Sequence, residues 1–391
     1  MAARARSRGK TSRSTGAARG GLAVIVLAAG KGTRMRSSRA KVLHEILGRP
    51  MGAYPIELGR ELGADPVVAV LGHQREAVEA ALIGRFGPDV VTVVEQTEQR
   101  GTGHAVRLAM PALKSFTGSL VLVLYGDVPL LRRETLQELV GTARRYKCLA
   151  LVTATPPDPS GYGRILRDQR GNVIGVVEEK DASPEERAIT EVNAGIYCGP
   201  TDFFREATAK LSARNAQGEY YLTDIIARAA NSIGVTAVEA DFRDVSGVND
   251  RHQLAEAEAV MRDRLNRAHM AHVTFRDPAT TEVQPDVTLD VDVELGRFVA
   301  LRGRTKVGHG AHIGDGAILT DVEVGPGAVV QPYTVAADVV IGPRASVGPF
   351  VHLRHTTVSA GSQEASGVPP VSKNGFPERG AKKYAATRKS G

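Results

Sequence analysis

The feature that most restricts the fold of this chain is a six-residue repeat in its last third. Aliphatic residues recur at six-residue steps with two short interruptions, and several are followed by glycine; they are Val307, Ile313, Leu319, Val324, Val330, Ile341, Val347 and Leu353. Aliphatic side chains at this spacing stack inside the corners of parallel β-helices built from hexapeptides. The repeat therefore predicts a short parallel β-helix of about three or four coils within residues 272–358.

Residues 22–248 follow a different pattern, in which apolar runs alternate with amphipathic segments. The apolar runs that we interpret as strands are Val24–Ala28, Val67–Leu71, Val90–Glu95, Ser119–Leu124, Leu149–Thr155, Ile165–Arg167, Val173–Glu178, Ala194–Cys198 and Thr236–Glu239. This alternation is typical of a doubly wound α/β sheet. A linker helix is predicted within residues 249–271, from one apolar stripe formed by Leu254, Ala257, Met261, Leu265 and Ala268.

The net charge of +7 is concentrated at the two ends of the chain. Residues 1–20 hold six basic residues and no acidic one, and residues 361–391 carry a net +4, which leaves −3 for the part between them. A mildly acidic body argues against nucleic-acid binding. We therefore predict disordered basic extensions at 1–21 and 359–391, although the first also has the composition of an organellar transit peptide.

Two further properties concern the location of the protein. No apolar run is long enough for a membrane-spanning helix, so we expect no membrane association. The two cysteines, Cys148 and Cys198, lack the spacing of a metal site or a disulfide framework, which suggests buried thiols in a reducing compartment. Together these properties predict a cytoplasmic protein.

The first strand candidate leads into a loop of small residues and cations. Ala28-Ala29-Gly30-Lys31-Gly32-Thr33-Arg34 follows the strand, and Lys41 lies seven residues after Arg34. Small residues let backbone N–H groups approach a ligand closely, and cations balance a polyanion. The loop lacks the Gly-Lys-Ser/Thr of a P-loop and the third glycine of a dinucleotide fingerprint. It favours a triphosphate cradle, with a solvated glycine-rich turn as the plain alternative.

Two polar clusters follow later strand candidates, at positions where ligands bind in doubly wound sheets. Gln96 precedes Gly101 and Thr102, and its carboxamide has the donors and the acceptor that complement the imide edge of uracil. Asp127, after Tyr125 and Gly126, is a carboxylate suited to hold Mg²⁺ against phosphates. Thr102 or Asp127 could instead cap a helix.

A third group of polar segments lies farther along, around Gly163, Glu178 and Asn193. Glycine admits the flat face of a sugar ring, whereas a carboxylate and a carboxamide can bond its hydroxyl and N-acetyl groups. Without a family for comparison, these segments indicate no more than three loops or hairpins.

The segment Leu27-Ala28-Ala29-Gly30-Lys31-Gly32-Thr33-Arg34-Met35, with Lys41-Val42-Leu43-His44 after it, resembles the N-terminal signature of sugar-nucleotide pyrophosphorylases. Within that family it is most similar to the uridylyltransferase half of the bacterial bifunctional enzymes that make UDP-N-acetylglucosamine. The resemblance implies a Rossmann-like nucleotidyltransferase domain followed by a left-handed parallel β-helix. It also implies transfer of UMP from UTP to N-acetylglucosamine 1-phosphate, with release of pyrophosphate and Mg²⁺ as the cofactor, in the synthesis of peptidoglycan precursors.

The resemblance also assigns roles to single residues. Catalysis falls to Arg34 and Lys41; nucleotide binding to Leu27, Ala28, Ala29, Gly30, Lys41, Gln96, Gly101, Thr102, Tyr125, Gly126 and Asp127; sugar binding to Gly163, Glu178 and Asn193; and metal binding to Asp127 and Asn249. The chain departs from the family's pattern at Ala40, which usually is proline, and at Ala194, which often is threonine.

The resemblance bears on the β-helix as well. The family carries an acetyltransferase on a longer helix, whereas the repeat here fades soon after Leu353, so we expect acetyltransferase activity to be absent. The expected partners are UTP and N-acetylglucosamine 1-phosphate, with a homotrimer assembled through the β-helix and weakened by its shortness. The alternatives are a bifunctional enzyme with both activities, a pyrophosphorylase for another sugar phosphate, and a nucleotide-sugar-binding protein with weak catalysis.

Overall fold

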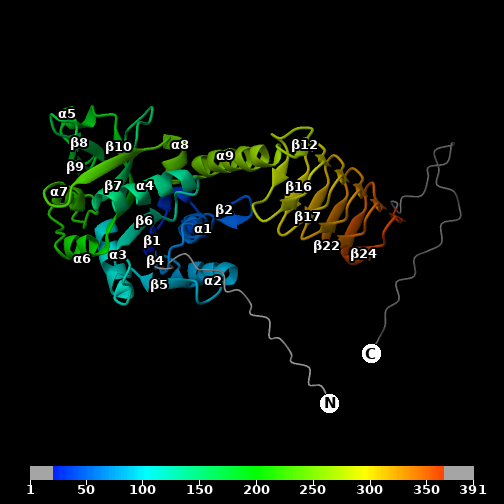
Figure 1. Cartoon of the computed structure of the whole chain (residues 1–391), viewed down its shortest axis with the longest axis horizontal. Helices are drawn as coiled ribbons and strands as arrows, with labels where there is room; N and C mark the ends of the chain where they lie inside the picture. The colour runs from blue at the N-terminus through cyan, green and yellow to red at the C-terminus, as the bar shows by residue number, and fades with distance from the viewer. Residues whose placement is uncertain (1–20, 365–391) are drawn as a thin grey trace, which may run out of the picture. The chain divides into compact units, whose positions relative to one another are not determined.

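The computed structural model describes residues 21–364, so most of the two basic extensions expected at 1–21 and 359–391 lies outside the described residues. The described chain divides into two compact units. The first contains the residues up to Glu45 together with Pro50–Leu254, and the second contains Ile46–Arg49 and the residues from Ala255 onward. Figure 1 shows a sheet flanked by helices in the first unit and a stack of short strands in the second.

The first unit is built on a nine-stranded, mostly parallel sheet. Its continuous part has the order β11-β7-β10-β6-β1-β4-β5, and β8 and β9 extend from β10. The strands are β1 (Leu22–Ala28), β4 (Val67–Leu71), β5 (Val91–Glu95), β6 (Leu120–Tyr125), β7 (Leu149–Ala154), β8 (Arg164–Arg167), β9 (Val173–Val177), β10 (Val192–Pro200) and β11 (Val235–Glu239). Because β10 is antiparallel to β6 and β7, it begins at the edge where those two strands end.

Helices cover both faces of this sheet, which confirms the predicted doubly wound α/β fold. They are α1 (Ala53–Glu61), α2 (Arg75–Phe86), α3 (Thr102–Ala109), α4 (Arg133–Tyr146), α5 (Pro184–Arg187), α6 (Thr201–Ala209), α7 (Asp224–Ala230) and α8 (Phe242–Val245), with 3-10 turns η1 (Thr33–Met35), η2 (Lys41–Leu43) and η3 (Met110–Leu113). In β1, Val24 and Val26 share a hydrophobic core with α1, α2 and α4. Ala23 and Ile25 share the other with α3, α6 and α7. Alternate side chains of one apolar strand thus fill two cores.

The register of the sheet brings four loops to one edge. Ala28 of β1 pairs with Leu71 of β4, and Leu71 pairs with Glu95 of β5. On the other side of β1, Leu27 pairs with Tyr125 of β6. These strands end level with one another, so the loops that follow them open at the same edge, where doubly wound sheets bind ligands.

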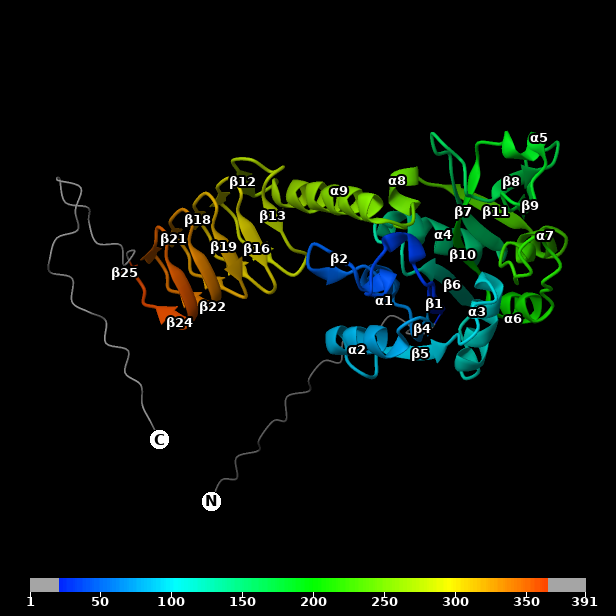
Figure 2. The ribbon, with the colours of Figure 1, turned by 180° about the vertical axis from the view of Figure 1, so that it is seen from behind.

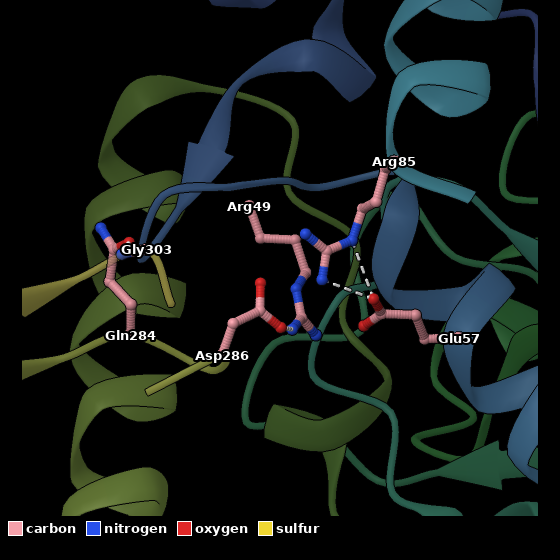
Figure 3. A network of polar contacts seen from close by, with 6 residues as sticks. All are labelled: Arg49, Glu57, Arg85, Gln284, Asp286 and Gly303. Atoms are coloured by element: carbon pink, nitrogen blue, oxygen red, sulfur yellow. Dashed lines mark hydrogen bonds and ion pairs between the residues drawn. The ribbon is translucent and has the colours of Figure 1, made fainter. Parts of the chain in front are cut away.

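A short hairpin, β2 (Glu45–Ile46) and β3 (Arg49–Pro50), has its tip in the second unit. The tip falls within residues 22–248, which were expected to form one domain, but it groups with the later part of the chain. Its Arg49 donates a hydrogen bond to Asp286 over 2.7 Å (Figure 3). Within the first unit, Arg85 of α2 pairs with Glu57 of α1 at 2.7 Å, also drawn in Figure 3.

The second unit forms the predicted parallel β-helix after helix α9 (Arg251–His269), where the linker helix was expected. Its strands are β12 (Val273–Phe275), β13 (Glu282–Val283), β14 (Thr288–Leu289), β15 (Val293–Leu295), β16 (Ala300–Arg302), β17 (Lys306–Val307), β18 (His312–Ile313), β19 (Ile318–Thr320), β20 (Glu323–Val324), β21 (Val329–Val330), β22 (Val335–Ile341), β23 (Ser346–Val347), β24 (His352–Val358) and β25 (Gln363–Glu364). Ala300 pairs with Ile318, 18 residues on, and Ile318 with Val335, 17 residues on. Figure 2 shows these stacked strands.

The β-helix extends farther than the repeat predicted. In the described residues, β12, β15, β18, β21, β23 and β25 form one column of six paired strands, where three or four coils were expected. The aliphatic side chains that the first coils bury continue the six-residue spacing back from Val307, although only one of them is followed by glycine; they are Val283, Leu289, Leu295 and Leu301. At the far end, Val347 pairs with Glu364, beyond the expected limit at residue 358.

The two cysteines and the apolar content of the helices were also subjects of prediction. Cys148 and Cys198 are both buried and free. Among the described residues, no helix combines the length and the apolar character needed to cross a membrane.

Candidate nucleotide-binding site

A cavity of about 310 Å³ lies at the edge where β1, β5 and β6 end. Its lining includes every residue that the resemblance assigned to the nucleotide except Gly126: Leu27, Ala28, Ala29, Gly30, Lys41, Gln96, Gly101, Thr102, Tyr125 and Asp127. Gly126 is buried, and its N–H donates to the carbonyl oxygen of Leu27 over 2.8 Å. That these residues bind a nucleotide stays a prediction, but the fold gathers them around one cavity.

The loop after β1 has the features of an anion cradle. Among the described residues, the backbone N–H groups of Gly30 and Lys31 have no hydrogen-bond partner. Gly32 has a φ of 60°, and a Cβ atom there would lie 2.6 Å from the Cβ of Lys41, so only glycine lets the two ends of the loop approach. Successive unpaired N–H groups in such a turn form a concave site for a phosphate.

Lys41 joins this loop to two other segments of the site. Its ammonium group forms an ion pair with Asp127, which follows β6, and donates to Oδ1 of Asn249 over 3.2 Å. The segment that carries Asn249 is held beside β6, because the N–H of Val248 donates to the carbonyl oxygen of Asp127 over 2.8 Å. The two residues assigned to the metal, 122 positions apart in the sequence, thus converge on one cation.

The donor set at this point fits Mg²⁺. One carboxylate and one carboxamide oxygen face the Lys41 ammonium, and Mg²⁺ needs only one or two protein oxygens when water and phosphates supply the rest. Within residues 21–364, no group of three or more His, Cys, Asp or Glu side chains forms a complete metal cage. The site thus suits a metal that arrives with a nucleotide's phosphates.

Gln96, which follows β5, also lines the cavity and is 5% exposed. Its Nε2 donates to the carbonyl oxygen of Gly101 over 3.1 Å and lies 3.3 Å from Nδ1 of His104. Burial lowers the pKa of His104, and the Arg107 guanidinium lowers it further, so a neutral imidazole can accept that bond. Both amide hydrogens of Gln96 then form hydrogen bonds within the protein, to Gly101 and to His104.

Four residues line the cavity that the resemblance did not assign: Val42, Gln99, Ala105 and Glu219. Gln99 connects two of the loops, because its Nε2 donates to the carbonyl oxygen of Ala29 over 2.6 Å. In the sequence, Gln99 is distinguished only by lying in the polar segment that follows β5. A contact across 70 positions cannot be read from local pattern, so sequence reasoning missed it.

Tyr125 relates this cavity to the residues assigned to the sugar. Burial raises the pKa of its phenol, opposed by a hydrogen bond with Thr102, whose hydroxyl also accepts from the N–H of Leu222 over 3.2 Å. On the other side, the Glu178 carboxylate adds to the rise in the Tyr125 pKa. Tyr125 thus lines the nucleotide cavity and is also influenced by the charge of Glu178, one of the sugar-assigned residues.

The three sugar-assigned residues form a cluster of their own. Asn193 donates its backbone N–H to the carbonyl oxygen of Gly163 over 2.9 Å. A Cβ atom at Gly163 would lie 2.7 Å from a methyl of Val176 and 3.4 Å from Oε2 of Glu178, so no side chain fits there. Glu178 accepts a hydrogen bond from the Thr223 hydroxyl at 2.9 Å, and burial raises its pKa.

The side chain of Asn193 is engaged within the protein. Its Nδ2 donates to the Tyr197 hydroxyl over 2.6 Å, and its Oδ1 accepts from the N–H of Gly195 over 3.2 Å. It is thereby held rigidly, and a contact with the sugar would use the remaining capacity of its oxygen. That contact stays a prediction.

Arg34 does not line the cavity; it is exposed on η1. It nevertheless lies near Tyr162: burial and the Asp127 carboxylate raise the pKa of the Tyr162 phenol, and the Arg34 guanidinium lowers it. The charges of Asp127 and Arg34 thus both affect the pKa of the Tyr162 phenol. An exposed arginine on a short turn can reorient toward a bound polyphosphate without disturbing the core.

Known proteins provide a separate comparison. Residues 24–219 match the model of the MobA-like NTP transferase domain family. The protein named Bifunctional protein GlmU of Anaeromyxobacter dehalogenans is 49% identical over 302 residues, covering 77% of this chain and 62% of the relative. The protein of the same name from Sorangium cellulosum is 50% identical over 307 residues, and that from Cutibacterium acnes is 46% identical over 312 residues, covering 64% and 73% of those relatives.

The match over 302 residues is longer than either unit, so it includes parts of both. The chain spans about 62% of the length of the Anaeromyxobacter relative. The matched segment contains the strand edge, the cavity and the Lys41–Asp127 ion pair described above. The chain belongs to the family of bifunctional GlmU proteins, and its first unit is a nucleotidyltransferase domain of the MobA-like type.

Proposed function

We propose that the first unit transfers UMP from UTP to N-acetylglucosamine 1-phosphate. The observation that carries this proposal is the convergence of Asp127 and Asn249 on Lys41, in a cavity that Lys41, Asp127 and Gln96 all line. A cation and two metal-type oxygen donors suit polyphosphate, and a buried carboxamide suits a base. The relatives named bifunctional GlmU support the same assignment.

The reaction needs little covalent chemistry from the protein. A phosphate oxygen of the sugar phosphate forms a bond to the α-phosphorus of UTP, and the bond from that phosphorus to the bridging oxygen of the β-phosphate breaks, releasing pyrophosphate. The attacking phosphate is already ionised, so no general base is required. Catalysis then depends on alignment and on the neutralisation of developing charge.

Each named group has a defined task in this proposal. The N–H groups of Gly30 and Lys31 and the ammonium of Lys41 bind the phosphates of UTP, and Arg34 turns toward the departing pyrophosphate. Asp127 and Asn249 would hold Mg²⁺, which would supply charge neutralisation for the phosphates. Glu178 accepts hydrogen bonds from sugar hydroxyls, and the absence of a side chain at Gly163 lets its backbone pack closely against Val176 and Glu178.

The test is a pyrophosphate-release assay over pairs of nucleotides and sugar phosphates. UTP with N-acetylglucosamine 1-phosphate should give the highest kcat/KM, and mass spectrometry should detect UDP-N-acetylglucosamine. A higher kcat/KM with another sugar phosphate would change the substrate assignment. Binding of the nucleotide sugar without turnover would favour a binding protein.

Two further expectations are part of the proposal. Acetyltransferase activity is expected to be absent, and release of coenzyme A from acetyl-CoA and glucosamine 1-phosphate above background would contradict that. We also propose a cytoplasmic location and a homotrimer formed through the β-helix and weakened by its shortness; sedimentation of the full chain would test the trimer.

A further inference from the structure

Gln74 connects the start of α2 to the loop that carries Lys41. It lies in the left-handed region, with φ 55° and ψ 40°, a conformation that costs energy for any residue with a Cβ atom. Its position is the N-cap of α2, yet its side chain does not cap that helix. Instead, the side chain reaches residues more than thirty positions earlier in the sequence.

Both ends of the Gln74 carboxamide bond the backbone of that loop. Oε1 accepts a hydrogen bond from the N–H of Ala40 over 2.9 Å, and Nε2 donates to the carbonyl oxygen of Ser38. Ala40 is only 2% exposed, so without Gln74 its N–H would be poorly hydrated. Two bonds to backbone groups two residues apart fix both the position and the direction of the chain between them.

That position controls the lysine that follows. Ala40 directly precedes η2, and its carbonyl oxygen accepts from the N–H of Leu43 over 2.9 Å, which closes the turn that contains Lys41. The Lys41 ammonium then reaches Asp127 and Asn249. A shift of the backbone at Ala40 would also displace the Lys41 ammonium, because Lys41 is the next residue and begins the turn that Ala40 closes.

We propose that Gln74 is a positioning residue for Lys41. Gln74 is not among the residues that line the cavity, and it acts by holding Ala40. The inference rests on the proposed nucleotidyl transfer, because its functional consequence is alignment of Lys41 with the phosphates. Small displacements of such groups lower kcat strongly.

The first variant is Gln74→Met, which keeps the length of the side chain and removes both hydrogen bonds. We expect kcat to fall about tenfold or more, with the KM for the sugar phosphate changed by less than about threefold. His73→Ala is the matched control, because His73 is the exposed neighbour of Gln74 and is not part of the site. It should have wild-type kinetics.

A second substitution tests the route through Ala40. The φ of Ala40 is −55°, which proline also adopts, so Ala40→Pro can stiffen this point while removing the N–H that Gln74 binds. In the Ala40→Pro background, Gln74→Met should change kcat by less than about threefold, a clear departure from additivity. Equal losses from Gln74→Met in both backgrounds would overturn the proposal.

Hydrogen–deuterium exchange gives a readout that does not depend on turnover. The N–H groups of Leu43 and His44 donate to the carbonyl oxygens of Ala40 and Lys41 over 2.9 and 3.2 Å. We expect these amides to exchange faster in Gln74→Met, and at the wild-type rate in His73→Ala. Unchanged exchange together with unchanged kcat would overturn the proposal, as would a uniform rise across the first unit with a lowered Tm, which would indicate a merely structural residue.

The two hypotheses fail in different ways. If the wild-type protein does not turn over UTP and N-acetylglucosamine 1-phosphate, the proposed function is wrong, and the exchange data still report whether Gln74 orders residues 40–44. If the wild type is active and Gln74→Met equals it in kcat and exchange, only the positioning role is wrong.

Discussion

The side chain of Gln96 donates a hydrogen bond to the carbonyl oxygen of Gly101 over 3.1 Å. A carbonyl oxygen can only accept, so the nitrogen end of the carboxamide must face Gly101. His104 Nδ1 lies 3.3 Å from the same nitrogen. In the described residues the Gln96 oxygen accepts no hydrogen bond, which leaves it as an acceptor for an N–H on the edge of a base.

From this relationship we expect Gln96→Glu to weaken UTP binding. A carboxylate cannot donate to Gly101 and would place an acceptor oxygen against its carbonyl, so the KM for UTP should rise about tenfold or more. Thr97→Ala, an exposed neighbour, serves as the control. Steady-state kinetics at saturating sugar phosphate would check the result, and an unchanged KM would remove Gln96 from base recognition.

Asp127→Ala should abolish magnesium-dependent turnover. The variant removes both a metal-type oxygen and the partner of the Lys41 ammonium, while the side chain does not belong to either hydrophobic core. We therefore expect a Tm close to that of the wild type and no measurable kcat at any Mg²⁺ concentration. Wild-type turnover at saturating Mg²⁺ would show that Asp127 is not needed.

Arg34→Ala should lower kcat about a hundredfold, as is usual for a group that stabilises charge developing in the transition state. Arg34 is exposed on η1, so its loss should not affect folding. Arg34→Lys should recover part of the rate, because it keeps the charge but not the planar donor geometry. A change confined to KM would mean that Arg34 only binds phosphate in the ground state.

The sequence allowed a good part of this fold to be predicted, because the relevant signals are local. The apolar run Val24–Ala28 is buried on both faces in a parallel sheet, and the spacing of Ile313 and Leu319 corresponds to buried positions in a parallel β-helix. Because the loop of Lys41 and the segment of Asp127 each follow a predicted strand, both could be assigned to the strand-end edge without any knowledge of contacts.

Other features could not be predicted because they depend on contacts between distant residues. The bonds from Gln74 to Ser38 and Ala40, and the bond from Gln99 to Ala29, join segments with no common pattern. Ala40 stands where the resembled family usually has proline. Its N–H donates a hydrogen bond to Gln74, which proline could not do.

The substitution Glu178→Gln should show separately how the buried charge affects the stability of the fold and how it contributes to sugar binding. Burial is the main cause of the raised pKa of Glu178, against which the Thr223 hydroxyl bond acts. A carboxyl whose pKa is raised in the folded state binds more protons there than in the unfolded chain, so its contribution to stability falls as pH rises through its titration range. Replacing it by a neutral amide should therefore raise the Tm at pH 8, and the gain should shrink as pH is lowered toward 5.

The same substitution should impair function. An amide keeps one oxygen for Thr223 but lacks the charge and the second acceptor, so we expect the KM for the sugar phosphate to rise about tenfold while the KM for UTP changes little. Thr223→Val is the complementary variant. It removes the hydroxyl that opposes the raised pKa of Glu178, so binding of the sugar phosphate should begin to weaken at a higher pH than in the wild type as pH falls. A lower Tm at pH 8 together with an unchanged KM would indicate that this carboxylate stabilises the fold of the domain and does not bind the sugar.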